Sequence, residues 1–112
     1  MQLISPVPRH SLILAFDDKI KLFKILFTKF KYYAEFQLKR VQQIVYSQGG
    51  QLVACKYGRG QNSCIVIINL LRLVEVCSFK PGAEPMQIFF NELDDELFVV
   101  NDNKTIQIFK LS

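Results

Sequence analysis

The hexapeptide Ile20-Lys-Leu-Phe-Lys-Ile25 recurs near the end of the chain as Ile106-Gln-Ile-Phe-Lys-Leu111, 86 residues later. A third version, Ile65-Val-Ile-Ile-Asn-Leu70, lies between them, 45 residues after the first and 41 before the last. The period is therefore about 43 residues. Repetition at a fixed period indicates that the chain is built from copies of one structural unit.

Each copy consists of short apolar runs that end at turn-forming residues. The run 52–57 ends at Gly58, the run 64–68 ends at Asn69, and the run 97–100 ends at Asn101. Runs of this length, rich in β-branched and aromatic residues, are typical of antiparallel strands. A period of about 40–45 residues with four strands is typical of propeller blades. The sequence therefore predicts an all-β fold of antiparallel four-stranded blades that form a partial β-propeller.

The predicted organisation is an N-terminal arm followed by three blades. The arm covers residues 1–10, for which a poor first strand containing Pro6 and Pro8 is the alternative, and the partial propeller covers 11–112. The blades are expected at about 11–37, 41–79 and 86–111, the first lacking its innermost strand and the third its outermost. Closed propellers have about four to eight blades. Since about two and a half blades cannot close a ring, we expect completion by a partner chain or by self-association.

Composition supports a folded domain without a metal or cofactor. Of the 112 residues, 50% are hydrophobic and 12% aromatic, which excludes a disordered tail. Cys55, Cys64 and Cys77 lie in apolar runs without metal-ligand spacing, and His10 is the sole histidine. The three thiols are expected to be small buried hydrophobes in a reducing compartment. No signal peptide or membrane-spanning segment is predicted.

No arrangement of side chains predicts catalysis. The carboxylates of Asp17–Asp18 and of Asp94–Asp95 lie where hairpin turns are expected, and no serine is placed with a base. The segment Gly58-Arg59-Gly60 is interpreted as a flexible turn, because the Lys–Ser/Thr pair of a phosphate-binding loop is missing. The chain is therefore expected not to be an enzyme, and no small-molecule substrate is predicted.

Positive charge is concentrated in residues 1–50, which hold eight basic and three acidic side chains, against six and seven in the remainder. Such an excess favours an acidic partner. The candidate partner-binding residues form a basic patch of Lys19, Lys21, Lys24, Lys29, Lys31, Lys39 and Arg40. An acidic protein surface such as that of tubulin is the expected target. The interleaved Tyr32–Tyr33 leaves open a small β-barrel that binds nucleic acid through stacking.

The segment 19–36 allows a second interpretation as a basic amphipathic helix. Six apolar residues recur there at helical spacing: Leu22, Phe23, Leu26, Phe27, Phe30 and Tyr33. Such a helix would make the chain a peripheral membrane protein or a calmodulin-type binder. Strands are favoured, because Lys19 and Lys29 would fall on the apolar face and because the segment repeats residues 106–111.

The second unit resembles a WD repeat. Its inner strand ends in Tyr46–Ser47, a Gly49–Gly50 turn follows, and the next strand carries Leu52-Val-Ala54. The positions of the usual Trp–Asp pair hold Ile68–Asn69. The segments 12–25 and 36–50 look like those of the large cilia- and flagella-associated WD-repeat proteins. The resemblance implies a non-enzymatic scaffold of the axoneme or another cytoskeletal assembly, in the cytoplasm.

Overall fold

The computed structural model describes residues 3–7, 11–26 and 29–111, and these form eleven strands in three antiparallel sheets. The first sheet contains β1 (Leu3–Val7), β2 (Ser11–Ala15), β3 (Ile20–Leu26) and β4 (Lys29–Phe36). The second contains β5 (Val41–Tyr46), β6 (Leu52–Tyr57), β7 (Cys64–Asn69) and β8 (Val74–Phe79), with the short 3-10 helix η1 (Gly60–Asn62). The third contains β9 (Pro85–Phe90), β10 (Glu96–Asn101) and β11 (Ile106–Lys110).

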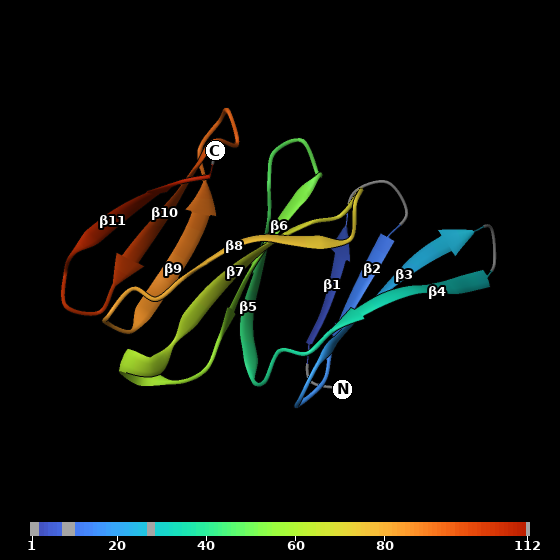
Figure 1. Cartoon of the computed structure of the whole chain (residues 1–112), viewed down its shortest axis with the longest axis horizontal. Helices are drawn as coiled ribbons and strands as arrows, with labels where there is room; N and C mark the ends of the chain where they lie inside the picture. Colours follow the sequence, from blue (N-terminus) through green and yellow to red (C-terminus); the bar gives the residue numbers. More distant parts are fainter. Residues whose placement is uncertain (1–2, 8–10, 27–28, 112) are drawn as a thin grey trace.

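The sheets follow one another through the molecule in chain order. Each is an antiparallel meander, and the second lies between the first and the third (Figure 1). The leading strand of each sheet faces its counterparts, since β5 contacts both β1 and β9. Successive meanders with adjacent leading strands form the arrangement of propeller blades. The predicted fold class, an all-β partial propeller, is confirmed.

The predicted N-terminal arm is wrong for residues 3–7, which form β1. This strand pairs with β2 from Leu3↔Ala15 to Val7↔Ser11, so the first sheet has four strands where three were expected. Pro6 misled the prediction because proline cannot donate a hydrogen bond to a neighbouring strand. β1 lies at the edge of its sheet, and a strand paired on one side tolerates that missing donor. His10 lies outside the described residues.

The alternative helix over residues 19–36 is also wrong, because the described residues from Ile20 onward belong to β3 and β4. Ile20 pairs with Phe36 and Lys21 with Glu35. Alternation decides the outcome: Ile20 and Leu22 are buried against the second sheet, while Lys21 and Phe23 point the other way. None of the described residues forms a helix long and apolar enough to cross a membrane.

The two central strands of the second sheet, β6 and β7, are covered on both faces, whereas β8 is largely exposed. In β6, Val53 and Cys55 pack toward the first sheet, whereas Ala54 packs toward the third. In β7, Val66 and Ile68 face the first sheet, and Ile65 and Ile67 face the third. Both strands are therefore nearly continuous apolar runs, as expected for strands that have no solvent face.

The outer sheets contribute one face each to this core. The first sheet supplies Ile13, Ala15, Ile20 and Leu22, and the third supplies Ile88, Phe90, Leu97 and Val99. At the rim of the second interface, the rings of Phe79 and Phe109 stack with centroids 4.3 Å apart.

Two side chains, Lys56 and Asp94, make polar contacts between the second sheet and the third. The buried Lys56 of β6 donates from Nζ to the Pro85 carbonyl and lies 3.6 Å from Glu84 Oε1. At the opposite end, the Asp94 carboxylate accepts hydrogen bonds from the main-chain N–H groups of Gln48 (2.7 Å) and Gly49 (2.8 Å). The β5–β6 and β9–β10 turns are thus held together by one side chain.

The three cysteines are free, and they differ in burial. Cys55 is fully buried, and this burial raises the pKa of its thiol to about 12. Cys64 and Cys77 are partly buried. Partial burial, and secondarily the neighbouring Glu75, raise the pKa of Cys77.

The core predicts the cost of truncation. Ile67→Ala should lower the free energy of unfolding by about 3 kcal/mol, because it removes a fully buried side chain between the second and third sheets. The matched control Leu71→Ala removes a side chain that is 65% exposed and should change stability by less than about 0.5 kcal/mol. Urea unfolding followed by circular dichroism measures both. Equal losses would contradict the packing described.

Thiol burial predicts the order of reaction with a disulfide reagent at about pH 8. Cys64 and Cys77 should react in the native protein, whereas Cys55 should react only after unfolding, because its raised pKa and burial leave almost no accessible thiolate. Absorbance of the released thiolate counts the groups that react. Cys55→Ser should remove the additional group that reacts after unfolding. Three equally fast thiols would refute this assignment.

Candidate functional site

The described part of the basic patch is divided between two places. Lys19 Nζ lies 3.7 Å from Glu35 Oε2, and Lys21 lies 5.4 Å from the Phe16 ring centroid and 6.0 Å from that of Tyr32. Both lysines belong to the outward side of the first sheet. Lys31 is exposed on β4, whereas Lys39 and Arg40 are exposed on the β4–β5 connection. The side chains of Lys24, Lys29 and Tyr33 lie outside the described set.

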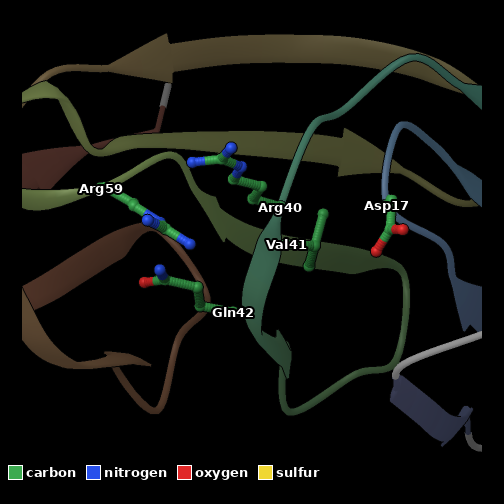
Figure 2. Close-up of a pocket in the computed structure, with 5 residues that line it drawn as sticks. All are labelled: Asp17, Arg40, Val41, Gln42 and Arg59. Atoms are coloured by element: carbon green, nitrogen blue, oxygen red, sulfur yellow. The ribbon is translucent and has the colours of Figure 1, made fainter.

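A pocket of about 440 Å³ opens where the chain enters β5. It is lined by Asp17, Arg40, Val41, Gln42 and Arg59. Figure 2 shows the polar ends of Arg40, Arg59 and Gln42 on one side of Val41, with Asp17 on the other. Of the patch residues whose side chains are described, Arg40 alone lines this pocket.

Strand pairing brings the two arginines of the pocket together. Val41, at the start of β5, is the register partner of Tyr57, at the end of β6. Arg40 immediately precedes Val41, and Arg59 follows Tyr57 by two residues. Arg40 and Arg59, which are 19 positions apart in sequence, therefore line the same pocket.

Arg59 lies between two glycines whose backbone conformations this turn requires. Gly58 has φ +89°, and a Cβ there would lie 3.0 Å from the Asn62 carbonyl oxygen. Gly60 has φ +56° and begins η1. Arg59 is extended between them, and its carbonyl accepts a 3.0 Å hydrogen bond from Asn62 N–H. Sequence reasoning interpreted this segment as a flexible turn and missed Arg59. An arginine between two glycines beside a strand was the available signal.

Arg40 adopts a backbone conformation that favours glycine. Its φ is +57°, in the left-handed region, which costs a residue with a Cβ about 1–2 kcal/mol. Its N–H donates a 3.0 Å hydrogen bond to the Asp17 carbonyl, tying the β4–β5 connection to the β2–β3 turn. Among the described side chains, neither Arg40 nor Arg59 forms an ion pair, so both guanidinium groups have free donors.

The acidic side chains of the third sheet and its turns take part in local structure. The Asn91 side chain donates to Asp95 Oδ1 at 2.6 Å and accepts from the main-chain N–H groups of Asp95 and Glu96. Asp94 joins two turns, as described above. The residues with described positions contain no group of three or more His, Cys, Asp or Glu side chains that could hold a metal ion.

Asn69 occupies the position where a WD repeat has its aspartate. Its Oδ1 accepts hydrogen bonds from the N–H groups of Leu71 (2.9 Å) and Arg72 (3.0 Å). The side chain therefore caps the β7–β8 turn of its own sheet.

The outward side of the third sheet is apolar at its centre, with Gln87 beside Val100 and Glu96 opposite Lys110 toward its ends, and the described residues leave it uncovered. We define the third outer face as Phe89, Phe98, Val100, Ile106 and Ile108. The register places Phe98 between Phe89 and Ile108, and the two phenylalanine rings meet edge to face at 5.3 Å. Ile106 is 67% exposed and Ile108 is 58% exposed. These side chains alternate along the strands with those buried against the second sheet.

The outward side of the first sheet is similar, with charge added. We define the first outer face as Leu12, Leu14, Lys21, Phe23 and Tyr32. Phe23 and Tyr32 meet edge to face at 5.8 Å, and Tyr32 is half exposed. Partial removal from water raises the pKa of the Tyr32 phenol, and the nearby Glu35 carboxylate raises it further.

The sequence matches no protein-family profile and no curated protein. Solved structures of similar fold include the β-propeller domain of Cps50 (Swd1) from Myceliophteria thermophila, with TM-score 0.72 and 16% identity over 98% of this chain and 38% of that one. A protein from Bacteroides fragilis, provisionally assigned as a 6-phosphogluconolactonase, gives TM-score 0.70 and 17% identity over 90% and 32%. The β-propeller domain of the trilobed protease of Pyrococcus furiosus gives TM-score 0.54 and 15% identity over 96% and 38%.

These similarities concern the fold, since all three identities lie below 20%. The chain spans about a third of the length of these structures. Two of them are β-propeller domains, in agreement with the propeller fold predicted from the sequence. The fold shared with these domains is that of a β-propeller, of which this chain forms three consecutive sheets.

Proposed function

We propose that this chain is a non-enzymatic protein-interaction scaffold, a β-propeller module of a ciliary axoneme or another cytoskeletal assembly. The observation that carries the proposal is the pair of apolar outer faces on the first and third sheets. Inside the chain, equivalent faces are fully buried against the second sheet. The outer faces have the same alternation and the same kinds of side chain, and burying them would be favourable by about 25 cal/mol per Å².

The proposed occupant is protein, because a sheet face is matched best by another sheet face. Flat rows of aromatic and β-branched residues pack against similar rows in sandwiches and in propellers. A partner chain or a second copy of this chain would complete the stack of sheets. The acidic partner expected from the charge distribution, such as tubulin, is part of this proposal.

The cytoskeletal setting is supported by the segments 12–25 and 36–50, which resemble cilia- and flagella-associated WD-repeat proteins. The fold supports a binding role in a more general way, since propeller domains serve as protein-interaction modules. The nucleic-acid alternative required a small β-barrel, and the described strands form three separate sheets instead.

The chain's state of association tests the scaffold role. We expect a mass above 13.0 kDa by light scattering after gel filtration, because two apolar faces are open. Phe89→Glu combined with Ile108→Glu should move the mass toward 13.0 kDa by placing charge on the third outer face. Leu93→Glu is the matched control, since Leu93 is 81% exposed in a turn. A 13.0 kDa monomer that binds no hydrophobic dye would mean that the faces are sealed, and would overturn the proposal.

Localisation tests the ciliary part separately. A fluorescently tagged chain expressed in ciliated cells should lie along the axoneme, and the Phe89→Glu/Ile108→Glu variant should become diffuse. The Leu93→Glu chain should behave as the wild type. A diffuse wild-type signal with an intact association in vitro would remove the ciliary assignment and leave the scaffold role standing.

A further inference from the structure

The pocket at the start of β5 concentrates hydrogen-bond donors that the fold does not use. Arg40 and Arg59 each carry five N–H donors, and among the described residues neither guanidinium is paired with a carboxylate. Gln42 adds an amide to the same wall (Figure 2). The planar fork of a guanidinium matches the two oxygens of a carboxylate, and two such forks in one pocket specify an anionic ligand.

The local charge favours an anionic ligand. Among the described lining residues, two arginines stand against one aspartate, and the exposed Lys39 adjoins Arg40 in the chain. The balance is positive, so negative charge is attracted. A carboxylate is the anion that an acidic protein partner supplies, and it matches the planar guanidinium fork.

The lining also argues against single-stranded nucleic acid. Platforms for that ligand combine basic residues with aromatic rings on which bases stack. None of the five lining residues is aromatic. Tyr32, which prompted this idea, belongs to the first outer face, where it contacts Phe23.

The backbone of Arg40 sets the direction of its side chain. Its φ of +57° is one that glycine would adopt without steric cost, and Leu73, Asp94 and Lys104 share this left-handed conformation. The strained residue directs a long cationic side chain over the start of β5, next to Arg59 (Figure 2).

We infer that this pocket binds glutamate or aspartate side chains of an acidic protein segment, with Arg40 and Arg59 as the carboxylate-binding residues. The inference deepens the proposed scaffold function and rests on it, since it names a site and a ligand chemistry for an acidic partner. The site is separate from the two outer faces, so a peptide can bind here while those faces engage other protein.

Fluorescence anisotropy with a labelled Glu-rich peptide tests the inference. The wild-type chain should bind this peptide and not its Gln-substituted counterpart. Arg59→Ala should weaken binding about tenfold, equivalent to about 1.4 kcal/mol, through loss of a charge-assisted pair. Arg40→Gly should weaken it similarly. Because glycine accepts the backbone conformation, that variant should unfold at a urea concentration no lower than the wild type.

Arg72→Ala is the matched control, because it removes one exposed arginine that lies outside both the pocket and the basic patch. It should leave affinity for the Glu-rich peptide within about twofold, as expected for a screened, distant charge. An equal loss in Arg72→Ala would show diffuse attraction and overturn the pocket assignment. Tighter binding of a single-stranded oligonucleotide, lost in the Arg40→Gly and Arg59→Ala variants, would overturn the choice of ligand.

Failure of this inference can be told apart from failure of the scaffold role. A wild-type chain that ignores the Glu-rich peptide but still associates above 13.0 kDa refutes the pocket and retains the scaffold. The opposite result is a monomer with sealed faces that still binds the peptide through Arg40 and Arg59. That result would refute the scaffold proposal and retain the pocket as a carboxylate-binding site.

Discussion

Burial of the central strands of the second sheet on both faces is the constraint on which the rest of the structure depends. Val53 and Cys55 point one way along β6 and Ala54 points the other, so no register of this strand can present a polar face to water. The first and third sheets must therefore flank it. Their own outer faces follow from the same strand alternation. The position of the pocket follows in turn from the β5–β6 register.

Much of this architecture could be predicted from the sequence because burial leaves a direct pattern. The apolar runs of β6 and β7 and the repeat of 20–25 at 106–111 were sufficient for the fold class. Elsewhere the pattern misled. Pro6 suggested an arm, although an edge strand tolerates proline. The apolar residues of 19–36 also fitted a helical period, and only pairing with neighbouring strands distinguishes the two.

The candidate site was predicted less completely than the fold, for a physical reason. A lysine-rich composition does not say which side chains converge. Lys21 lies on the first outer face and Lys19 pairs with Glu35, whereas Arg40 lies next to Arg59 from the β6–β7 connection. That meeting depends on register, a property of two strands, which single-strand patterns do not contain. The pocket and the outer faces give the module two different ways to hold protein, one by charge and one by apolar area.

Lys56 has a consequence for how the molecule would be cut or modified. Its ammonium is enclosed between β6 and the start of β9, where it meets Glu84 and the Pro85 carbonyl. Trypsin cleaves after extended, accessible basic residues, and acetylating enzymes need a free amine. An acetylating enzyme therefore reaches Lys56 only when the second and third sheets separate, whereas trypsin also requires β6 to leave β5 and β7. Acetylation of this one amine would report how often two neighbouring sheets come apart.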